Sequence, residues 1–119
     1  MMPNHVLGRV ILRGVPVNPG RVIGTVKMVA DLPAVDGEEW GDILVFTFLP
    51  TYRTPALLYA MKRASAVITD YGGRVSHIAV ISGELGKPCV ITKNAVSVLK
   101  NGQLITVDGT SGKIYAMKE

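Results

Sequence analysis

The sequence predicts an α/β domain of three layers, β/β/α, with a partly parallel sheet. Three features predict it: strand-like segments fill the first half, strands alternate with helices in the second half, and a hairpin pattern closes the chain. Parallel strands need crossover connections such as helices, whereas hairpins add antiparallel strands, here expected as a further β layer. The length of 119 residues suits a single domain over residues 1–119.

Composition narrows the class of protein. The chain is 48% hydrophobic and 18% charged, which supports a packed core. A single cysteine, Cys89, cannot form an internal disulfide and fits a reducing cytoplasm. No apolar run approaches the roughly 20 residues of a membrane span, and the N-terminus does not resemble a signal peptide, so a cytoplasmic protein without membrane contact is expected. The net charge of +4 is scattered and aromatic residues are 6%, which argues against nucleic-acid binding.

The first half contains three strand candidates and two connections. Val6–Leu12 and Val22–Val29 are predicted strands, and the glycine- and proline-rich segment 14–20 between them is predicted to be a shaped loop. Residues 31–39 form a polar connection. The continuous apolar run Ile43–Leu49 is typical of a strand buried on both faces.

The second half begins with a helix signal. Thr54 is suited to the N-cap and Pro55 to the first helical position. Apolar residues then recur at helical spacing: Leu57, Ala60, Met61 and Ala64. The short run Ala66–Thr69 follows as a buried strand.

A second helix is predicted from the Ser76 cap to about Leu85, with Ile78, Ile81 and Leu85 on one face. Gly86 ends the helix and Pro88 prevents its continuation. The remaining segments are predicted strands, the last two joined by a tight hairpin: Cys89–Thr92, Leu104–Val107 and Lys113–Ala116.

The candidate site lies between the strand 66–69 and the second helix. The first backbone N–H groups of a helix have no intrahelical partners and, with the helix dipole, bind anions. Gly72 and Gly73 would let the backbone approach a phosphate closely, while Arg74 and Ser76 would supply a charge and a hydroxyl.

His77 falls in the first turn of this helix. A neutral imidazole has a lone pair that can attack phosphorus, and the same N–H groups would stabilise the charge of the resulting phosphoramidate. The other histidine, His5, lies in a predicted tail, and no role is expected for it. No metal-binding cluster is evident in the sequence.

The segment 72–90 resembles the signature of the mobile phosphohistidine domain of the phosphoenolpyruvate-utilising enzymes. That signature is Gly-Gly, two variable residues, Ser/Cys-His, a helix of small and apolar residues, and Glu-x-Gly-x-Pro before a strand. The resemblance extends over nearly the whole chain. It includes the loop 14–20, the strand beginning at Gly41, and the closing segments around Asp108 and Gly112.

The resemblance implies a swivelling phosphohistidine domain. His77 would be the phosphoryl carrier, with Gly72, Gly73, Arg74 and Ser76 around its phosphate. The implied partners are an ATP-grasp kinase domain and a barrel domain that exchanges the phosphoryl group with pyruvate or phosphoenolpyruvate. ATP and Mg²⁺ would bind to the partner domains and no cofactor to this one. The chain would then be a part of a phosphotransferase such as phosphoenolpyruvate synthase, and not a complete enzyme alone.

Departures from the family pattern keep two other functions open. Val75 stands where the family usually has Thr, Gly83 where it commonly has Arg, and residues 48–50 lack the usual polar motif. These changes are compatible with a non-catalytic module that binds phosphate-bearing ligands. A hydro-lyase subunit is the third candidate, because swivelling β/β/α domains also serve dehydratases. Ser76 would be its reactive residue.

Overall fold

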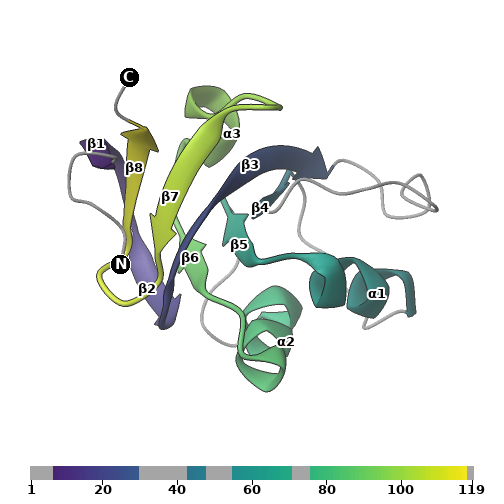
Figure 1. The fold of residues 1–119 in the computed structure, drawn as a ribbon. Helices are drawn as coiled ribbons and strands as arrows, with labels where there is room; N and C mark the ends of the chain where they lie inside the picture. Colours follow the sequence, from purple (N-terminus) through teal and green to yellow (C-terminus); the bar gives the residue numbers. More distant parts are fainter. Residues whose placement is uncertain (1–6, 30–42, 48–54, 71–75, 118–119) are drawn as a thin grey trace.

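The computed structural model describes residues 7–29, 43–47, 55–70 and 76–117 (Figure 1). These segments contain eight strands and three helices. The strands are β1 (Leu7–Arg13), β2 (Val15–Asn18), β3 (Arg21–Val29), β4 (Ile43–Phe46), β5 (Ala66–Thr69), β6 (Cys89–Ile91), β7 (Leu104–Asp108) and β8 (Lys113–Met117). The helices are α1 (Pro55–Arg63), α2 (His77–Leu85) and α3 (Ala95–Val98).

All eight strands join one mixed sheet in the order β1-β8-β7-β3-β4-β5-β6-β2. The central strands β3, β4, β5 and β6 are parallel. For β4, β5 and β6 this follows because β4 and β5 are each followed by a helix that returns the chain to the same edge. The flanking pairs are antiparallel: β1 with β8, β8 with β7, β7 with β3, and β6 with β2. The predicted fold class, an α/β domain with a partly parallel sheet, is confirmed.

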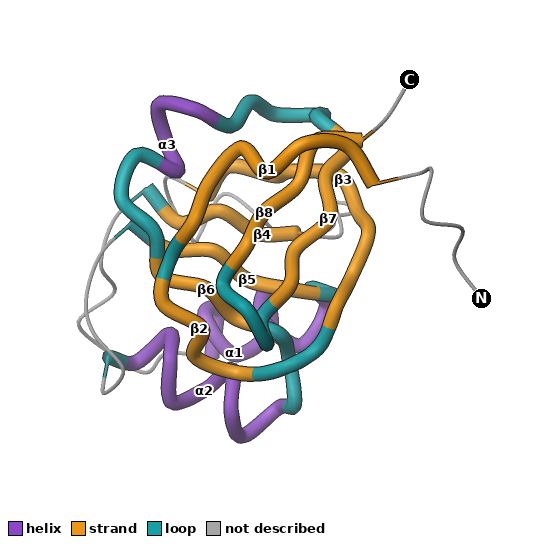
Figure 2. Tube along the Cα trace, turned by 90° about the vertical axis from the view of Figure 1, so that its left-hand side faces the viewer, coloured by secondary structure: helices purple, strands orange, loops and turns teal. Residues whose placement is uncertain are grey.

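The long strand β3 connects the two β layers. Its first part, Arg21–Thr25, pairs with β7, and its second part, Val26–Val29, pairs with β4. The sheet therefore curls at β3, so that the antiparallel strands lie over one face of the parallel ones. Figure 2 shows α1 and α2 together against the other side, with α3 at the opposite end of the domain. This arrangement is the β/β/α layering that the sequence predicts.

The sheet nearly closes on itself at Gly14. The two edge strands β1 and β2 are separated in sequence by this one residue. The N–H of Gly14 donates to the carbonyl of Gly112 (2.8 Å), and the Thr92 hydroxyl donates to the carbonyl of Arg13 (3.1 Å). A side chain at position 14 would collide with the carbonyl oxygen of Ile91, so the close approach of the strands requires glycine here.

The prediction of a loop over residues 14–20 is wrong, because Val15–Asn18 forms strand β2. Pro16 and the neighbouring glycines indicate a turn when read locally. However, β2 pairs only with β6 and is an edge strand, where a proline is tolerated because one side of the backbone needs no partner. Pairing between residues more than 70 positions apart therefore overrides the local signal.

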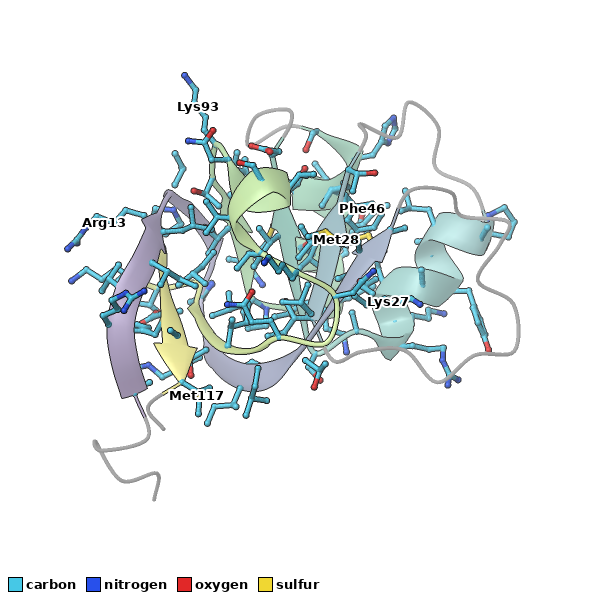
Figure 3. All side chains as sticks on the ribbon, turned by 90° about the horizontal axis from the view of Figure 1, so that it is seen from above. Arg13, Lys27, Met28, Phe46, Lys93 and Met117 are labelled. Atoms are coloured by element: carbon cyan, nitrogen blue, oxygen red, sulfur yellow. The ribbon has the colours of Figure 1, made fainter. Side chains whose placement is uncertain are left out.

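Two hydrophobic clusters lie on opposite faces of the parallel strands. On the helix side, Leu44 and Phe46 of β4 pack with residues of α1 and α2. On the other side, Ile43 and Val45 of β4 pack with residues of β7, β8 and α3. Phe46 lies in the interior, whereas Arg13 and Lys93 project outward (Figure 3). β4 is therefore buried on both faces, as its continuous apolar run predicts.

Both long helices occur where the sequence predicts them. α1 begins at Pro55 and buries Leu57, Ala60 and Met61; the predicted cap, Thr54, lies outside the described residues. The short helix α3 was not predicted, because its four residues carry no helical periodicity and its N-cap, Asn94, makes no capping bond with its side chain. Within the described segments, no helix has the length and apolar character needed to cross a membrane.

Candidate functional site

The candidate site is the N-terminal end of α2, which follows β5 after residues 70–76. The parallel strands β4, β5 and β6 place their carboxyl ends at one edge of the sheet. α2 begins at this edge and runs back along the helix-side face, where Ile78 and Ile81 are fully buried. Ligand sites of open α/β sheets form at this edge, so the fold places His77 where such sites occur.

Ser76 caps the helix as the sequence predicts. Its backbone is extended (φ −67°, ψ 161°), its side-chain oxygen accepts from the N–H of Ala79 (3.3 Å), and its carbonyl accepts from the N–H of Val80 (2.9 Å). The hydroxyl proton of Ser76 is not used in the capping bond, so it can still donate to a ligand. The N–H groups of His77 and Ile78 precede the first intrahelical bond, and none of the described residues supplies them with an acceptor.

His77 is the first residue of α2 and is half-buried, as is Ser76. Its backbone therefore belongs to the helix terminus while part of its side chain reaches solvent. Ser76 and His77 are the predicted site residues that the structure describes, and they are neighbours in one cap. Gly72, Gly73 and Arg74, predicted to bind phosphate, lie outside the described residues, so their role stays a prediction.

The opposite end of α2 is fixed by backbone and side-chain bonds. Gly86 takes the left-handed conformation (φ 69°), and the N–H of Lys87 donates to the carbonyl of Ser82 (2.9 Å), as in a Schellman ending. Asn18, at the end of β2, donates from its side-chain amide to the carbonyl of Lys87 (2.8 Å) and, at 3.4 Å, to that of Ser82. Asn18 therefore ties the end of α2 to the sheet, a contact that sequence reasoning missed because the partners are 64 and 69 positions apart.

A buried polar contact lies beneath α2. The Ser82 hydroxyl donates to the carbonyl of Ile78 (2.7 Å) and is fully buried. The pKa of the Cys89 thiol is raised to about 11, because the effect of burial exceeds the opposing effect of a hydrogen bond with Ser82. A neutral, buried thiol is a poor nucleophile, so Cys89 belongs to the packing of α2 and not to the chemistry of the site.

A second contact missed by sequence reasoning lies at the same edge of the sheet. Asp70, directly after β5, accepts at its carboxylate a hydrogen bond from the N–H of Val96 (3.4 Å). The N-terminal turn of α3 thus receives its cap from a residue 26 positions earlier. Asp70 therefore fixes α3 beside the end of β5.

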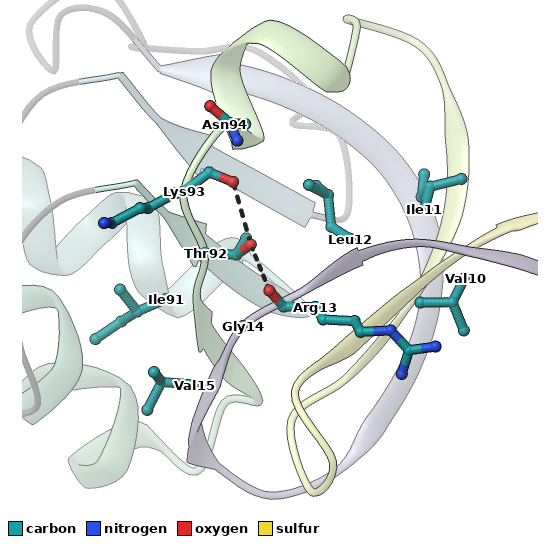
Figure 4. Close-up of a pocket in the computed structure, with 10 residues that line it drawn as sticks. All are labelled: Val10, Ile11, Leu12, Arg13, Gly14, Val15, Ile91, Thr92, Lys93 and Asn94. Atoms are coloured by element: carbon teal, nitrogen blue, oxygen red, sulfur yellow. Dashed lines mark hydrogen bonds between the residues drawn. The ribbon is translucent and has the colours of Figure 1, made fainter.

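A surface pocket of about 620 Å³ lies where β1 diverges from the end of β6, and neither Ser76 nor His77 lines it (Figure 4). Its walls are mainly the apolar side chains of β1 together with Ile91. The cations at its rim, Arg13 and Lys93, point away from each other in Figure 4. A binding site for a small polar ligand needs convergent polar groups, so the end of α2 is a better candidate than this pocket.

The fold and the site together define a class of protein: a three-layer α/β domain that presents one histidine at a capped helix N-terminus. Comparison with known families agrees, because the family described as "PEP-utilising enzyme, mobile domain" matches residues 38–112. The chain belongs to this mobile-domain family of the phosphoenolpyruvate-utilising enzymes.

Similar curated proteins are phosphoenolpyruvate synthases. The chain is 48% identical to the synthase of Pyrococcus furiosus over 107 residues, which cover 89% of this chain and 13% of that protein. It is 44% identical over 109 residues to a probable synthase of Archaeoglobus fulgidus, covering 91% of this chain and 14% of that protein. For the synthase of Neisseria meningitidis the identity is 43% over 97 residues, with coverages of 78% and 12%. The chain thus spans about one eighth of the length of these relatives.

Solved structures of similar shape support the fold. The crystal structure of Thermococcus kodakaraensis aconitase X superposes with a TM-score of 0.63 at 20% identity, covering 91% of this chain and 98% of that one. The solution structure of a UPF0107 protein gives a TM-score of 0.59 at 19% identity, covering 86% and 95%. Identities this low show a shared fold alone, so they add nothing to the hydro-lyase alternative.

Proposed function

We propose that the chain is a phosphocarrier domain that accepts a phosphoryl group on His77 and delivers it to a second active site. The observation that carries this proposal is the position of His77: a half-buried imidazole at the first residue of α2, next to backbone N–H groups without a helical acceptor. The donor would be an ATP-dependent kinase domain, which supplies ATP and Mg²⁺. The acceptor would be a domain that binds pyruvate and forms phosphoenolpyruvate.

The chemical step follows from this geometry. A ring nitrogen of His77 attacks phosphorus with its lone pair, an N–P bond forms, and the bond to the donor's bridging oxygen breaks with its electrons left on that oxygen. Because phosphoryl transfer depends mainly on positioning and on charge stabilisation, the N–H groups of His77 and Ile78 and the Ser76 hydroxyl are the groups of the described chain suited to it. Transfer to the acceptor is the reverse attack, by an acceptor oxygen on the same phosphorus.

The length of the relatives supports the proposal that the donor and acceptor sites lie outside this chain. They are named phosphoenolpyruvate synthases, and the chain aligns with about one eighth of their length. A carrier has no need of its own nucleotide or substrate site, whereas the remaining part of such a protein has room for both. Donor and acceptor sites are therefore proposed for partner domains, in one longer polypeptide or in separate subunits.

The test is intact-mass measurement of the chain after incubation with ATP, Mg²⁺ and a phosphoryl donor. A suitable donor is the Pyrococcus furiosus synthase from which the aligned 107 residues have been deleted, provided that it labels its own deleted segment supplied in trans. We expect one phosphoryl adduct that is stable in alkali and lost in acid. The adduct should be absent in His77→Ala and retained in His5→Ala, the matched control at the other histidine of the chain.

Absence of the adduct, with a donor that labels its own segment, would refute the carrier function. Binding of inorganic phosphate or ATP without covalent labelling would then favour the non-catalytic binding module, and Val75 and Gly83 would be the first positions to change.

A further inference from the structure

The exposed side of α2 carries residue types that contacts within the described domain do not require. Ile78 and Ile81 are fully buried, whereas Val80 is 43% exposed and Gly83 and Glu84 are exposed. Residues three and four apart on a helix share a face, so Val80 lies one turn from His77, and Gly83 one turn further along. We call His77, Val80 and Gly83 the outer face of α2, and the exposed Glu84, four residues after Val80, borders it.

Two of these residues, Val80 and Gly83, have low helix propensity and are exposed. Val80 is β-branched and loses side-chain freedom in a helix without gaining burial. Gly83 weakens a helix interior, yet a Cβ added there would meet no atom within 4 Å, so no neighbour within the described domain requires glycine. A residue that disfavours the helix and packs against none of the described residues suggests a requirement from outside the domain.

The neighbouring helix provides a contrast. Tyr59 on α1 is also exposed, at 48%, but its ring lies 5.5 Å from the Arg63 guanidinium and its hydroxyl accepts from Arg63 (3.4 Å). Tyr59 thus has a partner within its own helix. None of the described residues gives Val80 a partner of this kind, so its apolar methyl groups are available to another protein.

We propose that the outer face of α2 is the docking surface for the phosphoryl-donating domain; this inference rests on the proposed function. Nucleophile and phosphorus must come within about 3–3.5 Å, so the rim of the donor's active site has to cover the first turns of α2. The relatives have more than four fifths of their length outside the aligned segment, which is where this donor domain would lie. The rim we infer is apolar: Val80 fills a shallow hollow in it, and the missing side chain of Gly83 lets the partner's backbone approach closely.

The test measures the chain as a substrate of the same truncated Pyrococcus furiosus synthase, at varied chain concentration with ATP and Mg²⁺. Val80→Asn replaces an apolar contact without adding charge beside His77, and Leu104→Asn, at a side chain of β7 that is 49% exposed, is the matched control. We expect Val80→Asn to raise KM about tenfold or more with kcat within about twofold of the wild type, as for an interface hot spot. Leu104→Asn should leave both constants unchanged.

Gly83→Leu separates docking from folding. It adds a good helix former that meets no atom of the described domain, so the thermal midpoint should not fall, while the added bulk should still raise KM. If the wild type is labelled on His77 but both Val80→Asn and Gly83→Leu keep the KM of the control, the docking surface is refuted and the carrier function stands. If the wild type is not labelled at all, the carrier function itself fails.

Discussion

The helices α1 and α2 cover the same side of the sheet, have nine residues each, and differ in what fixes and surrounds them. Both bury a set of apolar residues in the same cluster, among them Leu57 and Met61 of α1 and Ile78 and Ile81 of α2. α1 ends in two cations, Lys62 and Arg63, whereas the last turn of α2 has no basic residue and carries the exposed Glu84. Burial therefore does not distinguish the two helices; their ends and outward sides do.

Among the described residues, the bonds at their ends show that α2, which carries His77, is held in position more firmly than α1. α2 has a side-chain cap at Ser76, a left-handed glycine at its end, and the Asn18 amide donating to the carbonyls of Ser82 and Lys87. α1 ends in the charged side chains typical of a helix that faces solvent. A helix that must present one imidazole to successive partners needs a fixed axis, and the bonds at both ends of α2 provide one.

Truncating buried residues should have the largest effect on stability, and it tests whether both helices are anchored in the core. Ile81→Ala and Leu57→Ala each remove a fully buried side chain from the same cluster. Each should lower the free energy of unfolding by about 2–5 kcal/mol in urea denaturation, the range for such truncations. A loss below about 1 kcal/mol for one helix alone would show that this helix is not anchored in the core as described.

A pH effect should distinguish α2 from α1, because Cys89 packs beneath α2 and bonds with Ser82. Its pKa in the folded protein is about 11 against an ordinary value of 9.0. The unfolded chain therefore loses this proton first as pH rises. The contribution of Cys89 to the free energy of unfolding should be constant below pH 9. It should fall by roughly 2–3 kcal/mol between about pH 9 and pH 11. Urea denaturation across this range should show a smaller fall for Cys89→Ala, because other titrating groups are common to both proteins. Equal falls would mean that Cys89 is not buried as a neutral thiol.

Removing the cap of α2 should have a moderate effect. Ser76→Ala leaves the N–H of Ala79 without its side-chain acceptor and should cost about 1 kcal/mol in thermal or urea unfolding. Ser76→Asp keeps an acceptor at the cap and serves as the control, with stability close to the wild type. A larger loss for Ser76→Asp than for Ser76→Ala would contradict the capping geometry.

The smallest effects come from the two glycines of α2, which should respond in opposite directions. Gly83→Ala adds a methyl group that meets no atom within 4 Å and should stabilise the helix by up to about 1 kcal/mol. Gly86→Ala also meets nothing, but position 86 has φ +69°, so a side chain there should cost about 1 kcal/mol. The sign of each change in thermal midpoint is the measurement, and equal signs would refute the assigned backbone conformations.

Local signals explain which parts of the fold could be predicted. Pro55, Ser76 and Gly86 act within one helical turn, so both long helices and the end of α2 were predicted from neighbouring residues. Strand β2 was missed because Pro16 indicates a turn locally, while the pairing that overrides it comes from β6, more than 70 positions away. The capping of α3 by Asp70 has the same non-local origin.

The candidate site also combines features that local sequence determines with features that depend on distant contacts. Ser76 and His77 could be placed from the sequence, because a cap and the residue after it define a helix terminus on their own. The anchoring of α2 by Asn18 could not, since it depends on the edge strand β2 lying against the end of the helix. The exposure of Val80 also depends on which side of α2 the sheet covers.

The most direct test of the carrier function places the chain in a complete catalytic cycle. The chain would replace the aligned 107 residues of the Pyrococcus furiosus synthase, and formation of phosphoenolpyruvate from pyruvate and ATP would be measured. We expect activity in the chimaera and in its His5→Ala variant, and complete loss in its His77→Ala variant, which should still fold with an unchanged thermal midpoint. A His77→Ala chimaera that retains activity would contradict the phosphocarrier function of this domain.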